Sequence, residues 1–153
     1  MTESWDGLVA ELRAGRGRPA FVNMSTDASG SLAALQGSVA EVISVGQRVA
    51  NCDSPGDVAR VVQPRHASTL MVDIEALFTP ELHLDVIALL RTFAQRCALV
   101  VVWPGRIAAG RLSYSLPGRA DYLDEPAKDL VVLSPVVTHF PDEIPYTVER
   151  YPA

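Results

Sequence analysis

Long apolar runs constrain the fold of this chain more than any other feature. "STLMVDI" (68–74), "ALVVVW" (98–103) and "LVVLSP" (130–135) are mostly apolar and rich in β-branched residues. Strands of this kind are buried on both faces, as in parallel sheets that helices cover on each side. "PAFVNM" (19–24) and "VISV" (42–45) predict two shorter strands that precede them. The sequence therefore predicts a five-stranded, mainly parallel sheet.

Segments with helical spacing separate these strands. Residues 1–18 contain an amphipathic helix, and further helices are predicted at 31–42 and from Ser54 onward. A longer helix is predicted at 79–96, because Thr79 is a suitable N-cap and a proline follows it in the first turn. The alternation implies three layers, with helices on both faces of the sheet. Both the flavodoxin-like and the P-loop strand orders fit, and in either one ligands bind beyond the carboxyl ends of the strands.

The length and the remaining segments indicate a single domain. A chain of 153 residues can bury one sizeable core, so we expect residues 1–153 to form one domain. Residues 106–128 are polar, acidic and rich in turn residues, which predicts an excursion over the surface with a short hairpin at 111–115. The prolines of residues 135–153 predict an extended, partly packed C-terminal tail.

Charge and composition limit the classes of partner. The net charge is -5 and the 13 Lys and Arg residues are spread along the chain, whereas a nucleic-acid surface carries a basic stripe. The longest apolar run, 97–103, is too short to span a bilayer, and the first residues are acidic where a secretion signal is basic. Cys52 and Cys97 lack metal-ligand spacing. We expect a cytoplasmic protein without a membrane segment or a metal site, with nucleic-acid contact only through a complex.

The stretch "NMSTDASGSLAAL" (23–35) lies where nucleotide-binding proteins have a phosphate loop. That loop has the pattern G-x-x-x-x-G-K-[ST], in which the lysine meets the outer phosphates and the hydroxyl holds magnesium. Serine stands in place of the first glycine and of the lysine, leucine replaces the hydroxyl, and Asp27 would repel phosphate. The sequence therefore predicts a vestigial loop that does not hold ATP tightly, formed by Ser25, Thr26, Asp27, Ser29, Gly30 and Ser31.

Two acids follow the third predicted strand in "LMVDIE" (70–75). An apolar run that ends in a carboxylate has the form of the acidic strand end that holds magnesium in P-loop proteins. Asp73 is then the metal-side acid and Glu75 the candidate base, although the usual catalytic glutamate directly follows the aspartate. A second interpretation is that Asp73 only caps a neighbouring turn.

A receiver domain would also carry an aspartate at the end of its third strand. It further requires an acidic pair after strand one, a hydroxyl after strand four and a lysine after strand five. The corresponding residues here are Asn23, Trp103 and Ser134, so the receiver interpretation is disfavoured.

Aromatic and arginine residues follow the fourth predicted strand. Tyrosine, tryptophan and arginine are enriched in protein interfaces, and they also serve in packing. We expect a partner-contact surface formed by Trp103, Arg106, Arg111, Tyr114 and Tyr122.

The order and spacing of two segments resemble a known family. "LMVDIEALFTPELHLDVIALLRTFAQRCALVVVWPG" (70–105) and "GRLSYSLPGRADY" (110–122) are similar to BrxF, the small P-loop subunit of some BREX bacteriophage-exclusion systems. "VISVGQRVA" (42–50) also resembles the second strand and following helix of that family. The likeness covers about two thirds of the chain, with no single motif that is specific.

The resemblance implies a P-loop NTPase-like three-layer fold with strand order 5-1-4-3-2, in which the Walker B acid corresponds to Asp73. The family has glycines, lysine and threonine in its phosphate loop, and this chain departs from it there. We therefore expect a non-catalytic subunit without a cofactor that binds other defence proteins or a second copy of itself. The alternatives are an active ATPase that binds ATP and Mg²⁺ through an unusual loop, and a degenerate receiver-like regulatory domain.

Overall fold

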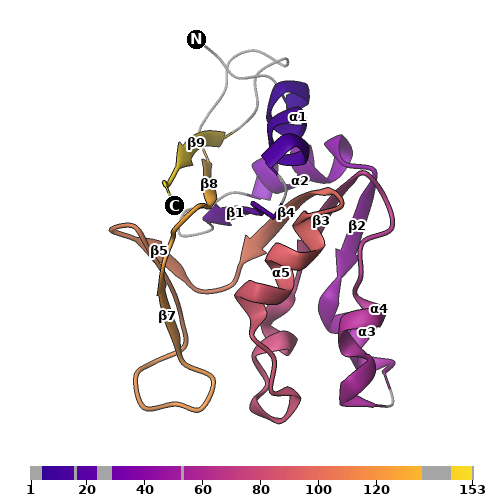
Figure 1. Cartoon of the computed structure of the whole chain (residues 1–153), viewed down its shortest axis with the longest axis vertical. Coiled ribbons are helices and arrows are strands. Elements are labelled where there is room, and N and C mark those ends of the chain that lie inside the picture. Colours follow the sequence, from indigo (N-terminus) through magenta and orange to yellow (C-terminus); the bar gives the residue numbers. More distant parts are fainter. Residues whose placement is uncertain (1–4, 16, 24–28, 53, 136–145, 153) are drawn as a thin grey trace.

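The computed structural model describes residues 5–15, 17–23, 29–52, 54–135 and 146–152. Its main element is a six-stranded sheet with the order β2-β3-β4-β1-β8-β9 (Figure 1). The strands are β1 (Ala20–Asn23), β2 (Glu41–Ser44), β3 (Ser68–Val72), β4 (Ala98–Trp103), β8 (Val131–Pro135) and β9 (Tyr146–Arg150). Neighbouring strands from β2 to β8 are parallel, and β9 is antiparallel to β8. The chain is therefore an α/β protein with a mixed, mostly parallel sheet.

The sheet corrects the prediction of five strands in the order 5-1-4-3-2. A sixth strand, β9, extends the edge beyond β8, so both the strand count and the full order differ. The alternation of Tyr146 and Val148 with polar residues suits an edge strand, but the prolines before it predict only an extended tail. The parallel strands follow one another as β8-β1-β4-β3-β2. Because β1 does not lie between β2 and β3, the flavodoxin-like order is excluded.

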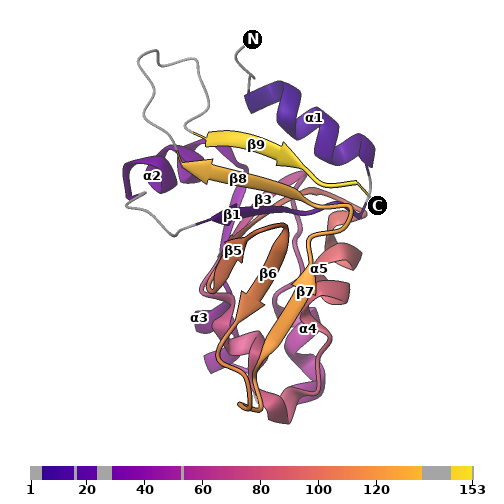
Figure 2. The ribbon, with the colours of Figure 1, turned by 90° about the vertical axis from the view of Figure 1, so that its left-hand side faces the viewer.

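Helices cover both faces of the sheet, and side chains of β1 and β4 alternate between two cores. Phe21 and Val101 contribute to the core on one face, and Val22 and Val100 contribute to the core on the other. The first core includes residues of α3 (Val45–Ala50), α4 (Val58–Val61) and α5 (Val86–Ala94). The second includes residues of α1 (Trp5–Gly15) and α2 (Ser29–Ser38). Figure 2 shows α1 and α5 on opposite sides of the sheet.

The helices differ in length from their predictions. α2 ends at Ser38 and not at residue 42, because residues 41–44 belong to β2. The helix predicted from Ser54 begins as a short 3-10 helix, η1 (Pro55–Asp57), and continues as α4. No helix within the described ranges is long and apolar enough to cross a membrane.

The single helix predicted at 79–96 is divided in two. The 3-10 helices η2 (Ile74–Phe78) and η3 (Pro80–Leu82) precede a left-handed residue, His83, at φ 51°. α5 then begins after Asp85, whose Oδ1 accepts a hydrogen bond of 3.1 Å from the Ala88 amide. Thr79 does not cap, because its hydroxyl donates to the Ala76 carbonyl oxygen at 2.8 Å. Aspartate at 85 is the better N-cap, so the helix starts there.

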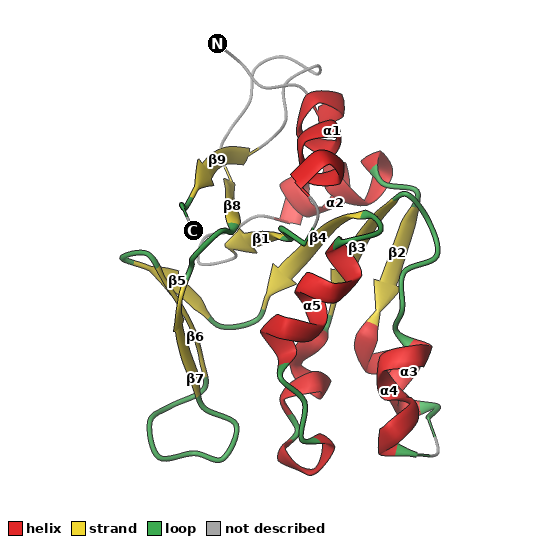
Figure 3. Cartoon of the chain, in the orientation of Figure 1, coloured by secondary structure: helices red, strands yellow, loops and turns green. Residues whose placement is uncertain are grey.

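Residues 106–128 form a second sheet and not an irregular excursion with a hairpin at 111–115. The antiparallel strands are β5 (Arg106–Ala108), β6 (Arg111–Tyr114) and β7 (Leu123–Pro126), coloured yellow in Figure 3. Ala109 and Gly110 connect β5 to β6, both with positive φ (53° and 72°), which suits a tight two-residue hairpin turn. Buried Ile107 and Leu112 anchor this sheet to the first core.

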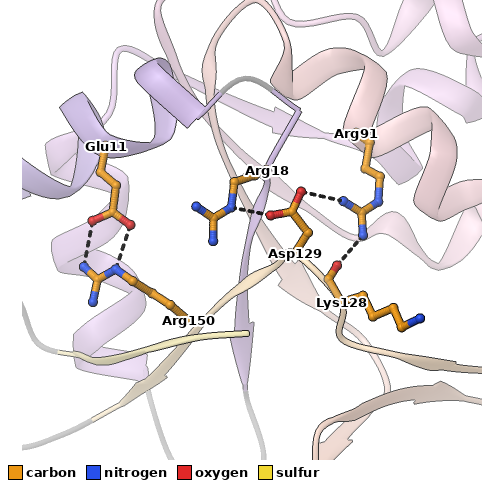
Figure 4. A network of polar contacts seen from close by, with 6 residues as sticks. All are labelled: Glu11, Arg18, Arg91, Lys128, Asp129 and Arg150. Carbon is orange, nitrogen blue, oxygen red and sulfur yellow. Dashed lines mark hydrogen bonds and ion pairs between the residues drawn. The ribbon is translucent and has the colours of Figure 1, made fainter. Parts of the chain in front are cut away.

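Ion pairs connect the first helix and the last strand to the rest of the fold (Figure 4). Arg150 of β9 donates to both carboxylate oxygens of Glu11 in α1, at 2.7 and 2.8 Å. Asp129, just before β8, lies 2.9 Å from Arg18 and 4.0 Å from Arg91 of α5. The first pair thus joins α1 to β9, an edge strand of the sheet, and the Asp129 pairs join the segment before β1 to the segment before β8 and to α5.

Candidate functional site

The candidate site lies at the carboxyl ends of the parallel strands, where open α/β sheets bind ligands. Asn23 ends β1 beside Trp103, which ends β4, and Asp73 directly follows β3. The three residues therefore come to one edge of the sheet, as their positions after apolar runs predict.

Asp73 is exposed and held by the neighbouring strand. Its Oδ2 accepts a hydrogen bond of 3.0 Å from Ser44 Oγ at the end of β2. A Cβ added at Gly46 in α3 would lie 3.6 Å from the Asp73 Cβ, so this helix approaches the acid closely. Asp73 occupies the N-cap position of η2 with φ 55°, but its side chain makes no capping hydrogen bond. Its role as a simple turn cap is therefore not supported.

Glu75 lies two residues farther on, exposed on η2. Its charge is one of the influences that raise the pKa of Tyr114, after burial and the charge of Asp121. Within the described part of the chain, no three His, Cys, Asp or Glu side chains are grouped so as to hold a metal ion.

The predicted vestigial phosphate loop falls partly outside the described residues. Ser25, Thr26 and Asp27 lie outside them, and Ser29, Gly30 and Ser31 form the start of α2. Next to this loop, Asn23 Nδ2 donates to the Ile107 carbonyl oxygen at 3.3 Å. The end of β1 is thus connected to the small sheet.

Trp103 belongs to the core, which corrects its assignment as a partner-contact residue. Its side chain is 1% exposed, and its Nε1 donates to the Ser113 carbonyl oxygen at 3.0 Å. Its ring packs edge-on against Phe21 and Phe78, with centroid distances of 5.4 and 5.7 Å. Trp103 therefore joins the main sheet to the small one.

Tyr114 has mainly a packing role. Its ring stacks on Phe78 with centroids 4.1 Å apart and planes 23° apart. Burial is the main cause that raises its pKa. The loop that follows is closed by Ser115, whose hydroxyl donates to Asp121 at 2.5 Å.

The other three predicted contact residues lie on the surface of the small sheet. Arg111 Nε pairs with Asp124 at 2.8 Å, and the Tyr122 hydroxyl donates to the same carboxylate at 3.3 Å. Arg106 is exposed on β5. Arg111 lies on β6 and Tyr122 directly precedes β7, and the structure brings these two residues together through Asp124.

A groove of about 480 Å³ lies between residues 77–86, which precede and begin α5, and residues 120–125 at the start of β7. We call it the η3–β7 groove; its apolar lining includes Leu77, Phe78, Leu84, Val86 and Leu123. Its polar lining includes His83, Asp85, Asp121, Tyr122 and Glu125. Partial burial raises the pKa of Glu125, and the charge of Asp85 raises it further, against a lowering effect of Arg91.

The acids of the η3–β7 groove were not among the predicted site residues. The segments "PELHLD" (80–85) and "DYLDE" (121–125) each intersperse acids among apolar residues, which is the signal of a half-buried acidic surface. Only the fold brings these two segments together.

Comparisons with known proteins return no relatives. No protein-family model matches the sequence, and neither a curated protein nor a solved structure matches it.

Proposed function

We propose that this protein is a non-catalytic subunit with P-loop-like topology that works by binding other proteins of a BREX-type anti-phage defence system. The resemblance of residues 70–105 and 110–122 to BrxF motivates the choice of system. Two exposed apolar side chains on the connection between β6 and β7, one of which lines the η3–β7 groove, support protein binding as the function.

The strand order supports the topology. β4 lies between β1 and β3, as in a P-loop sheet, and Asp73 follows β3. A receiver domain would have β1 between β2 and β3. The degenerate receiver is therefore the weaker alternative.

The residues after β1 support a non-catalytic role. Ser31 stands where a phosphate loop has its lysine, and Leu32 stands where it has the magnesium-binding hydroxyl. An active ATPase would need both functions from other residues. The Ser44 hydroxyl already donates a hydrogen bond to one carboxylate oxygen of Asp73, the acid expected on the metal side.

Exposed apolar residues support a protein partner. In the described part of the chain, the large hydrophobic residues that are exposed are Val42, Leu116 and Tyr122, at 41%, 63% and 39%. Leu116 and Tyr122 both lie on the connection between β6 and β7, and Tyr122 also lines the η3–β7 groove. Exposed apolar side chains beside an apolar groove are typical of protein-binding surfaces.

Co-purification tests the proposed contact. The chain would be co-expressed with the products of its neighbouring genes, and the complexes would be isolated through a tag on the chain. We expect Leu116→Ser combined with Tyr122→Ser to release the partner. Val42→Ser, on the edge strand β2, is the matched control and retains it. If both variants retain the partner equally, the η3–β7 groove is not the site of the partner contact.

A phage-restriction assay tests the proposed system. In a host that lacks the gene, the wild-type protein and Asp73→Asn would restore protection equally, because no nucleotide chemistry is required. The Leu116→Ser, Tyr122→Ser protein would not restore it. Loss of protection with Asp73→Asn alone would favour the active ATPase.

A further inference from the structure

A second cavity, of about 710 Å³, lies at the opposite end of the strands from Asp73. Its walls come from the end of α4, residues 63–67 before β3, and residues 89–97 of α5 and the turn that follows. We call it the α4–α5 pocket. Both β3 and β4 begin beside it, so it is separate from the site at the carboxyl ends of the strands.

The charged residues that line the α4–α5 pocket are all basic. Arg60, Arg65 and Arg96 line it together with His66, and no aspartate or glutamate does. The whole chain has 18 acids against 13 Lys and Arg residues, so an all-basic pocket is unexpected from composition. Three arginines from three segments therefore create a local positive potential in an acidic protein.

Two of these arginines have no carboxylate partner. Arg60 pairs with Asp57 at 3.2 Å, but that pair is exposed and weak. Within the described ranges, no acid lies within ion-pair distance of the Arg65 or Arg96 side chains, whereas Arg111 and Arg150 each have one. Arg65 and Arg96 are therefore available to an anion from solution.

A second acid close to the pocket, Glu41, has its carboxylate bound by other groups. Its Oε1 accepts hydrogen bonds from the Arg65 backbone amide at 3.0 Å and from Thr69 Oγ1 at 3.2 Å. Its side chain is 13% exposed and lies 4.0 Å from Arg48. Glu41 therefore positions the 63–67 segment, and its charge also contributes to the raised pKa of Cys97 in the pocket.

Apolar and neutral groups line the rest of the pocket. Leu89 is partly buried, and Phe93 and Cys97 are 9% and 4% exposed. Burial raises the pKa of Cys97 to about 11, so this side chain remains a neutral thiol near pH 7. The pocket thus combines an apolar surface with a basic rim.

We propose that the α4–α5 pocket binds a small organic anion, whose phosphate or carboxylate is held by Arg65 and Arg96 and whose apolar part contacts Phe93 and Leu89. Guanidinium groups match the planar, two-pronged geometry of both anions. The volume is in the range of small-molecule sites. A nucleic acid would require a basic stripe along the surface, and here the basic groups surround one pocket.

NMR titration of the ¹⁵N-labelled full chain at low salt tests the site. The probes are phenyl phosphate, benzoate, inorganic phosphate and the neutral benzyl alcohol. We expect phenyl phosphate or benzoate to shift the amides of 60–67 and 89–97, and to bind more tightly than inorganic phosphate or benzyl alcohol. The tighter of the two aromatic anions identifies phosphate or carboxylate as the preferred group.

Matched arginine variants assign the contacts. Arg65→Gln and Arg96→Gln should each weaken binding by about tenfold, because each removes one charge-assisted contact. Arg119→Gln makes the same charge change on the β6–β7 connection and should leave binding unchanged. Far-ultraviolet circular dichroism and thermal melting would verify that each variant is folded.

Three results would overturn the proposal. The first is no shift of these amides at about 10 mM of either aromatic anion. The second is equal weakening by Arg119→Gln, which would mean a non-specific charge effect. The third is a Glu-rich decapeptide that shifts these amides while phenyl phosphate and benzoate do not, which would assign the pocket to an acidic protein segment.

Discussion

Glu11 in the first helix and Arg150 in the last strand form a two-pronged ion pair, with nitrogen–oxygen distances of 2.7 and 2.8 Å. The two side chains are 34% and 39% exposed, so solvent screens the pair. Nevertheless, it joins two elements that belong to opposite ends of the described chain.

We expect the pair to contribute about 0.5 to 1 kcal/mol to the free energy of unfolding near neutral pH. The hydrogen bond from Arg150 is the main cause that lowers the pKa of Glu11 below its ordinary value of 4.5. A carboxyl group whose pKa is lowered on folding stabilises the protein when the pH is above its pKa in the unfolded state. That stabilisation is lost as the pH falls through its pKa in the folded state. A double-mutant cycle with Glu11→Gln and Arg150→Gln, by urea unfolding at pH 7 and pH 3, should show a larger coupling at pH 7 than at pH 3. Equal coupling at both values would assign it to packing.

Asp73 should tolerate asparagine better than alanine. Its φ of 55° is left-handed, a conformation that asparagine adopts more readily than alanine. The asparagine side-chain oxygen can also accept the Ser44 hydrogen bond. We expect Asp73→Ala to lower the free energy of unfolding by about 1 kcal/mol more than Asp73→Asn does, measured by urea unfolding. Identical values would show that neither the backbone conformation nor the Ser44 contact contributes.

Gly105 and Gly37 should respond to alanine in opposite directions. A Cβ at Gly105 would lie 1.9 Å from the Ser113 carbonyl oxygen, so Gly105→Ala must displace backbone and should cost about 3 kcal/mol. At Gly37 in α2, nothing lies within 4 Å of an added Cβ, and alanine favours the helix by up to about 1 kcal/mol. Thermal melting of both variants measures the difference. A stable Gly105→Ala protein would mean that β5 and β6 are farther apart than described.

Alanine substitutions at Tyr114 and Tyr122 should distinguish a residue that packs in the fold from one that is available to contact a partner. Tyr114→Ala removes the stacking on Phe78 and should lower the free energy of unfolding by about 2 kcal/mol. Tyr122→Ala removes a 39% exposed side chain and should change it by about 0.5 kcal/mol or less. If Tyr122→Ala is the more destabilising, Tyr122 is not available as a contact residue.

We expect the dissociation constant for Mg-ATP to be about millimolar or weaker. The serine in place of the lysine loses a charge-assisted contact worth roughly 1.5 to 3 kcal/mol, which is about a tenfold to hundredfold loss in affinity. Isothermal titration calorimetry measures this directly. A micromolar dissociation constant that Asp73→Asn weakens would instead identify an active nucleotide site.

The strands of the parallel sheet were the most predictable elements, because continuous runs of β-branched residues favour a buried strand over a helix or a loop. β4 has the predicted bounds, 98–103. The division of 79–96 was not predicted, because the stripe of apolar residues continues on both sides of His83. Only the choice between two N-cap residues, Thr79 and Asp85, decides where the helix starts. β5 and β7 are three and four residues long and lack an apolar run. The turn residues around them therefore predicted a surface excursion and not strands.

The candidate sites were predictable only where one strand end carries the residue, as with Asp73. The η3–β7 groove and the α4–α5 pocket each combine residues from segments far apart in the sequence, such as Arg60 and Arg96. No local pattern encodes such a juxtaposition, because it depends on how the helices pack on the sheet.

The position of β1 in the sheet has a consequence for how the chain folds during synthesis. Its two neighbours are Ala98–Trp103 and Val131–Pro135, both far downstream. β1 therefore leaves the ribosome before either of its partners in the sheet has been made. β2 and β3 can pair earlier, but the sheet closes around β1 only after β8 has been made, which makes the emerging apolar segment a natural client for chaperones.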